Sequence, residues 1–209
     1  MPLWLPAGFS HTAEVVVKRS RFLGTVARVN SEAAARDVIG RARTDHPAAR
    51  HHGSAFSVDV AGAQPVERSS DDGEPAGTAG TPILETLRGA GLSNCVAVVT
   101  RYFGGVLLGA GGLARAYSAA TEAALSVAPR VRPVTEQVVT IQLDPADAGR
   151  IEGALLARGV TVIDTRWETV VTLTLATTDL SQTTAVIHEI VQRPVAVTPS
   201  GTRVTEQAA

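Results

Sequence analysis

The chain has 209 residues, of which 44% are hydrophobic, 4% aromatic and 19% charged, and its formal net charge is −1. This composition is typical of a globular protein and too apolar for disorder, and the length suits one large domain or two small ones. The near-neutral charge argues against a protein that binds nucleic acid through charge alone. No run of roughly 18 apolar residues could span a bilayer, and the start of the chain lacks the pattern of a signal peptide. We therefore expect a cytoplasmic protein without a membrane partner.

The first half of the chain predicts a mixed domain of strands and helices. A helix begins after Ser31, a typical N-cap residue, and stops before Pro47. The polar, glycine-rich stretch 61–82 is predicted to be a long loop, a kind of segment that is usually functional or disordered. A second helix at 81–91, a buried strand at 94–103 and a glycine-rich turn leading into a long helix at 104–129 follow. Strands are also expected within residues 14–29, with a hairpin near 19–21, and at 54–60.

The second half predicts the order β-α-β-β-α-β, which is the ferredoxin-like plan. Strands are expected at 134–143, 160–167, 168–176 and 194–205, with helices at 144–159 and 179–193. We place the domains at 1–132 and 133–209. The first carries 14 basic and 11 acidic residues, a net charge of +3, and the second 5 and 9, a net charge of −4. The predicted core of the second domain is Val139, Ile141, Leu155, Ile163, Val171, Leu173, Ile187 and Ile190.

Three carboxylates, Asp71, Asp72 and Glu74, lie within four residues of the long loop. They could hold a hard cation such as Mg²⁺ or simply belong to an exposed turn. The run lacks the repeated oxygen ligands of a known metal loop, so no metal is predicted. Because buried carboxylates need partners, we expect at least one of them to lie within salt-bridge reach of Arg101 or Arg115.

The glycine-rich segment after the strand that contains Arg101 is a candidate anion site. The N-terminus of a helix presents free N–H groups and the positive end of its dipole, and arginines can clamp a phosphate or carboxylate there. The alternative is that the glycines only allow close packing and that Arg101 pairs with the acidic run. The candidate ligand-binding residues are Arg101, Gly105, Gly109, Gly111, Gly112, Arg115 and Tyr117.

His51 and His52 stand directly before a predicted strand, and histidine is the usual general base. Adjacent residues of a strand point to opposite faces, so the two side chains are not expected to meet at one point. They remain possible site residues. The single cysteine, Cys95, rules out an internal disulfide and is expected to be an inert core residue.

Four segments together resemble the IMPACT/YigZ family. They are KRSRFLGTVARV, HPAARHHGSAF, SSDDGEPAGTAGTPIL and VVTRYFGGVLLGAGGLARAYSAA. The resemblance implies an α+β protein of two domains. The first would have the fold of a domain of a small-subunit ribosomal protein, a superfold that sugar kinases share, and the ferredoxin-like second would be similar to the last domain of elongation factor G. Ala76 stands where the family commonly has serine.

The resemblance favours a non-enzymatic regulatory or binding protein without a cofactor, linked to translation through the ribosome, RNA or a translation factor. Eukaryotic relatives act in translational control. The alternative is an enzyme that handles phosphates or nucleotides in a cleft formed by the acidic run, the arginines and the glycines. A third hypothesis is a peptide-binding module. The sequence leaves the oligomeric state open.

Overall fold

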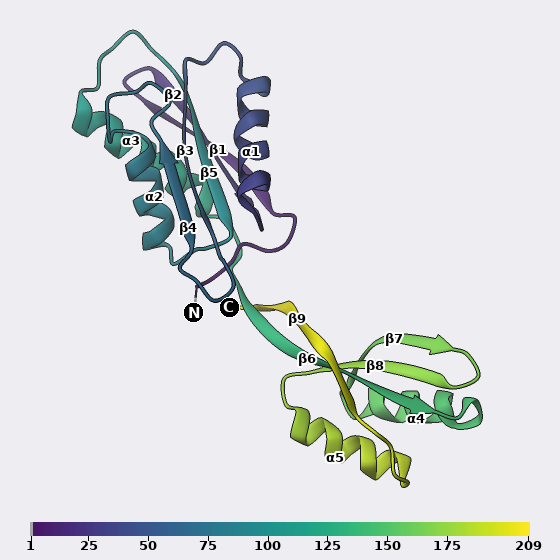
Figure 1. Cartoon of the computed structure of the whole chain (residues 1–209). Helices are drawn as coiled ribbons and strands as arrows, with labels where there is room; N and C mark the ends of the chain where they lie inside the picture. The colour runs from purple at the N-terminus through teal and green to yellow at the C-terminus, as the bar shows by residue number, and fades with distance from the viewer. Residues whose placement is uncertain (1) are drawn as a thin grey trace. The chain divides into compact units, whose positions relative to one another are not determined.

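The computed structural model describes residues 2–209, which form two compact units (Figure 1). One unit extends as far as Arg132 and also includes Ala208–Ala209, and the other comprises Pro133–Gln207. Both units combine helices with an antiparallel sheet, so the predicted α+β class in two domains is confirmed. Within the described residues, no helix is long and apolar enough to cross a membrane.

The first unit is a five-stranded sheet with helices on both faces (Figure 1). Its strands lie in the order β1-β2-β5-β3-β4, with α1 on one face and α2 and α3 on the other. On β5, Cys95, Ala97 and Val99 face α2 and α3, whereas Val96 and Val98 face α1, as the alternation of a strand requires. The elements are β1 (Ser10–Val17), β2 (Ser20–Arg28), α1 (Glu32–Asp45), β3 (His51–Val58), β4 (Val66–Ser70), α2 (Gly80–Gly89), β5 (Cys95–Tyr102) and α3 (Ala110–Leu125).

Two local predictions for this unit are confirmed, the helix cap at Ser31 and the burial of Cys95. The Ser31 side chain accepts a hydrogen bond from the backbone N–H of Ala34 at 3.1 Å and caps α1. Cys95 is fully buried, and this burial raises the pKa of its thiol to about 12, so it is an inert core residue.

The prediction of a loop over 61–82 is wrong in part, because β4 forms inside it. β4 pairs with β3 along its whole length, with Ser70 opposite Ser54 and Arg68 opposite Phe56. Its sequence, VERSS, has little apolar character. As an edge strand it is defined by its hydrogen bonds to β3 rather than by a buried face, so it leaves no alternating pattern to detect.

The second unit has the predicted β-α-β-β-α-β order. Its four-stranded sheet runs β7-β8-β6-β9, which is the ferredoxin-like arrangement. Asp179 caps α5 by accepting a hydrogen bond from the backbone N–H of Gln182 at 2.9 Å. The elements are β6 (Val131–Leu143), α4 (Pro145–Ala157), β7 (Thr161–Trp167), β8 (Val171–Thr177), α5 (Leu180–Val191) and β9 (Thr198–Ala208).

Six of the eight predicted core residues of this unit are fully buried, and Ile163 is not. Ile163 lies at a bulge between Val162 and Asp164, and 37% of it is exposed. The bulge breaks the alternation of β7 and turns this side chain away from the core. Ile190 is partly buried and packs against the edge of the core.

We predict that residues 133–207 fold alone, because this unit has a core of its own. The isolated segment should unfold cooperatively on heating, with marginal stability as expected for its size. Leu173→Ala should lower its free energy of unfolding by about 2–5 kcal/mol. Ile163→Ala is the matched control and should cost less than about 1 kcal/mol, since its side chain packs little. A gradual, non-cooperative melt of the isolated segment would contradict the prediction.

Candidate functional site

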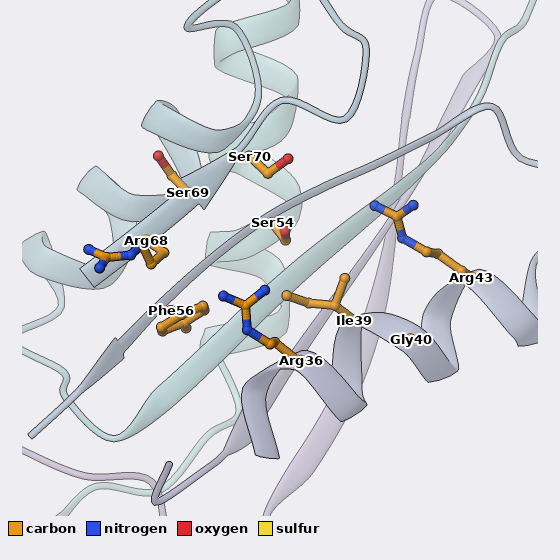
Figure 2. Close-up of a pocket in the computed structure, with 9 residues that line it drawn as sticks. All are labelled: Arg36, Ile39, Gly40, Arg43, Ser54, Phe56, Arg68, Ser69 and Ser70. Atoms are coloured by element: carbon orange, nitrogen blue, oxygen red, sulfur yellow. The ribbon is translucent and has the colours of Figure 1, made fainter. Parts of the chain in front are cut away.

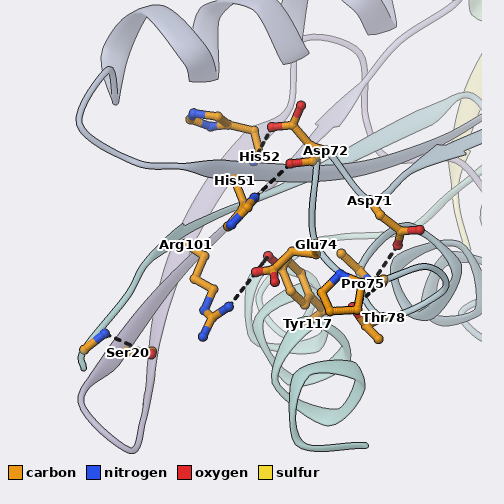
Figure 3. Close-up of polar contacts among 12 residues, drawn as sticks. Ser20, His51, His52, Asp71, Asp72, Glu74, Pro75, Thr78, Arg101 and Tyr117 are labelled. Carbon is orange, nitrogen blue, oxygen red and sulfur yellow. Dashed lines mark hydrogen bonds and ion pairs between the residues drawn. The ribbon is translucent and has the colours of Figure 1, made fainter. Parts of the chain in front are cut away.

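Glu74 of the acidic run forms a buried ion pair with Arg101 (Figure 3). The Arg101 Nη1 lies 2.7 Å from the Glu74 Oε1, and the two side chains are 8% and 3% exposed. The Tyr117 hydroxyl donates to the same oxygen at 2.8 Å. The predicted meeting of the acidic run with Arg101 is confirmed, and it joins the loop to the end of β5 and to α3.

Arg101 is therefore not available as a free anion clamp. Its guanidinium lies 5.5 Å from the ring centroids of both Phe22 and Phe103, and Glu74 neutralises its charge. Tyr117 is fully buried, and burial first, then the nearby Glu74 charge, raise the pKa of its hydroxyl, so it acts as a hydrogen-bond donor. Of the two possibilities set out from the sequence, the structure shows pairing of Arg101 with the acidic run.

Asp71 organises the start of α2. Its Oδ1 accepts hydrogen bonds from the backbone N–H groups of Ala79 and Gly80, both at 2.9 Å, and its Oδ2 accepts one from Gly77 at 2.8 Å. Partial burial of the carboxylate acts to raise its pKa, but these hydrogen bonds outweigh burial and the pKa of Asp71 is lowered. Asp71 thus serves α2, and it does not neutralise the dipole of α3.

Asp72 connects the loop to β3 and α1. Its Oδ1 lies 2.6 Å from the Arg43 Nη2, and its Oδ2 accepts a hydrogen bond from the backbone N–H of His52 at 2.7 Å. The backbone oxygen of Asp72 lies 2.9 Å from the His51 Nδ1 (Figure 3). The acidic run therefore also pairs with Arg43, an arginine that the sequence analysis does not name as a partner.

The two histidines point into different surroundings, as their neighbouring positions in a strand predict. His51 is half-buried and faces the loop, whereas His52 is buried with its Nδ1 3.0 Å from the Thr100 Oγ1. Burial lowers the pKa of His52, against an opposing effect of the Asp72 carboxylate. His52 is thus a neutral, internally bonded side chain at physiological pH.

The glycines after β5 serve close packing and turns. A Cβ at Gly104 would lie 2.0 Å from the backbone carbon of Arg19, so only glycine fits there. Gly105 and Gly109 have φ of +84° and +71°, which other L-residues rarely adopt. These three glycines have structural reasons to be present that require no ligand.

At the start of α3, a ligand-binding role for Gly111, Gly112 and Arg115 stays a prediction. A Cβ at Gly111 would meet the far end of Arg115 at 3.7 Å, an ordinary contact, and one at Gly112 would meet the Leu108 Cβ at 3.0 Å. Arg115 is exposed, and in residues 2–209 it has no hydrogen bond or ion pair. With Lys18 and Gly112 it lines a pocket of about 290 Å³.

A larger groove, which the sequence did not reveal, lies between α1 and the strands β3 and β4 (Figure 2). This α1–β4 groove has a volume of about 470 Å³. One signal was available, since Arg36 and Arg43 are seven residues apart and share a face of α1. The third arginine, Arg68, lies in β4, within the stretch for which the sequence predicts a loop. The lining includes Arg36, Arg43, Ser54, Phe56, Arg68 and Ser70.

No group of three or more His, Cys, Asp or Glu side chains placed to hold a metal ion occurs in the described part of the chain. The carboxylates of the acidic run instead accept hydrogen bonds from N–H and O–H groups of the protein.

Replacing Glu74 should destabilise the first unit much more than removing its tyrosine partner. Glu74→Gln leaves the buried Arg101 without a countercharge, and we expect a loss of about 3–5 kcal/mol in the free energy of unfolding. Tyr117→Phe removes one hydrogen bond to a carboxylate that keeps Arg101 and should cost about 1–2 kcal/mol. Urea unfolding followed by Trp4 fluorescence, in a Trp167→Phe background, measures both. Equal losses would show that the ion pair is not the dominant interaction.

Asp71 should make the stability of the first unit depend on acid. Because its folded-state pKa is lowered, its contribution is complete above about pH 4, the ordinary pKa of aspartate, and is lost as the pH falls through the folded-state pKa. Asp71→Asn should lower stability at pH 7 and flatten the acid limb between about pH 5 and pH 2. Urea titrations across this range test this, with Ala76→Ser, at an exposed position of the same loop, as the control. An unchanged acid limb in Asp71→Asn would contradict it.

Comparison with known proteins identifies the family of this chain. The model of the Impact N-terminal domain matches residues 18–125. The IMPACT family member YigZ of Escherichia coli (strain K12) is 38% identical over 181 residues, 84% of this chain and 86% of that protein. The IMPACT family member YvyE of Bacillus subtilis (strain 168) is 38% identical over 142 residues, 68% of this chain and 64% of that protein. A crystal structure described as that of a hypothetical protein covers 95% of this chain and 97% of its own, with 33% identity and a TM-score of 0.62. The chain belongs to the IMPACT family.

Proposed function

We propose that this protein is a non-enzymatic binding protein of the cytoplasm, linked to translation through the ribosome, RNA or a translation factor. The observation that carries the non-enzymatic part is the internal use of the acidic run. Asp71 binds backbone N–H groups, Asp72 binds Arg43 and the His52 backbone, and Glu74 binds Arg101 and Tyr117. A catalytic carboxylate must reach a proton of the substrate, and the Glu74 side chain is 3% exposed.

The distribution of charge favours a binding surface on the first unit. Residues 1–132 carry a net charge of +3 and residues 133–209 a net charge of −4. A surface that recognises phosphates needs local positive charge, and three arginines line the α1–β4 groove of the first unit. The family resemblance implies folds similar to domains of a ribosomal protein and of an elongation factor, which adds an argument by analogy.

The phosphate-handling enzyme has one observation in its favour. Arg115 and Lys18 line a pocket beside the first turn of α3, and that turn carries no acidic residue to offset the helix dipole. Arg101, the other side chain expected there, is committed to Glu74. Release of phosphate from Mg²⁺–ATP by the purified protein, lost in Gly111→Asp, would favour the enzyme over the binding protein.

Co-sedimentation with ribosomes tests the proposal. We expect the full chain to pellet with ribosomal particles at low salt and to be released as salt rises from about 50 mM to about 200 mM, because contacts to phosphates release counterions. The segment 133–207 should stay in the supernatant under all conditions. A full chain that never pellets would contradict the link to the ribosome, and a segment 133–207 that pellets equally well would contradict the assignment of binding to the first unit.

A further inference from the structure

The α1–β4 groove is a cationic site of the size of a ligand pocket. Its volume of about 470 Å³ falls within the range of small-molecule sites. Arg36 and Arg43 line it from α1 and Arg68 from β4, and none of the described residues that line it is a carboxylate (Figure 2). Arg36 and Arg43 lie seven residues apart, about 10 Å along the helix axis.

The three guanidinium groups are not neutralised equally. Arg36 pairs with Glu32 and Arg43 with Asp72, both at the edge of the groove. Arg68 donates from Nη1 to the backbone oxygen of Glu67, and within residues 2–209 it has no ion pair. The Glu67 carboxylate is instead paired with Arg88. The groove therefore retains at least one positive charge for a ligand.

Ser54 places an uncharged hydroxyl among the groove-lining side chains. The residue as a whole is 4% exposed. It lies at the floor of the groove, opposite Ser70 of β4 (Figure 2). A hydroxyl that lines a groove can exchange its contacts with water for a hydrogen bond to a hydroxyl-bearing ligand.

We propose that the α1–β4 groove binds the phosphate–ribose backbone of single-stranded RNA, an inference that rests on the proposed function. Guanidinium groups at both ends bind phosphates as charge-assisted pairs, and the Ser54 hydroxyl between them bonds a ribose hydroxyl. Phe56 is 4% exposed and offers little face for stacking a base, so the contacts carry little sequence preference. The combination of guanidinium groups with a neutral hydroxyl in the groove matches the alternating phosphates and ribose hydroxyls of this backbone.

The test is a fluorescence-anisotropy titration of the full chain with a labelled oligouridine. Arg36→Gln and Arg68→Gln should each weaken binding about tenfold, as expected for loss of a charge-assisted hydrogen bond. Each should also flatten the slope of log K against log salt by about 0.7. Arg41→Gln is the matched control. It removes the same charge from an exposed position of α1 outside the groove and should change affinity by less than about twofold.

Ser54→Ala separates hydroxyl recognition from charge. It should weaken binding to oligouridine and leave the salt slope unchanged, because a neutral group is removed. Its melting temperature should change little, since the hydroxyl that is removed lines the groove. A salt slope that changes, or binding that stays the same, would overturn the role of Ser54.

The outcomes separate this inference from the proposed function. Suppose that the protein pellets with ribosomes but does not bind oligouridine, or that Arg36→Gln, Arg68→Gln and Arg41→Gln all bind oligouridine equally well. The groove is then not the RNA site, whereas the link to the ribosome stands. If oligouridine binding depends on the groove but the protein does not pellet with ribosomes, the groove is an RNA site and the link to the ribosome is wrong. An acidic peptide or ADP that binds as tightly as oligouridine would overturn the choice of RNA.

Discussion

The first unit depends on the buried ion pair between Glu74 and Arg101. It joins a loop, a strand end and a helix that lie far apart in sequence, and Tyr117 completes it from α3. Phe22 packs edge-on against the Tyr117 ring at 5.3 Å and lies beneath the guanidinium, so the pair is enclosed by apolar surface. Removing either charge leaves the other buried without a countercharge. The resulting loss in the free energy of unfolding is far larger than the contribution of an exposed ion pair. The loop that follows β4 is thereby held in one conformation.

That conformation couples the family motif to the groove. With Glu74 fixed, Asp71 caps α2 and Asp72 reaches the backbone of β3 and the guanidinium of Arg43. Arg43 lines the groove, so the acidic run sets the position of one of its three arginines. Directly after this loop, at the first residue of α2, a Cβ at Gly80 would lie 2.6 Å from the backbone of Ser70, another residue of the groove. The acidic run therefore shapes a groove that its own carboxylates do not line.

Local signals and the need of buried charges for partners were predictable from the sequence, whereas features defined by strand pairing or by the packing of two distant elements were not. The Ser31 cap follows from a few neighbouring residues, and the need of buried carboxylates for arginine partners predicted the contact with Arg101. β4 was not predicted because it is defined by its hydrogen bonds to β3 and not by a pattern in its own sequence. The exposure of Ile163 was not predicted because a single bulge reverses the face of a strand. The groove needed both α1 and β4 to be known, so it could not be inferred from the sequence.

The carboxylates of the acidic run and Arg101, although they belong to the family motifs, are thus not placed to bind a partner. The carboxylates of the acidic run and Arg101 have their hydrogen bonds inside the protein, whereas Arg36 and Arg68 point into an open groove from segments outside the motifs. Ala76 illustrates the difference. It is exposed at the turn of the acidic loop, and the bonds of Asp71 on either side of it run to backbone N–H groups. A serine hydroxyl at this position is not needed for that network, so its replacement by alanine leaves the scaffold intact and is compatible with a protein that binds without catalysis.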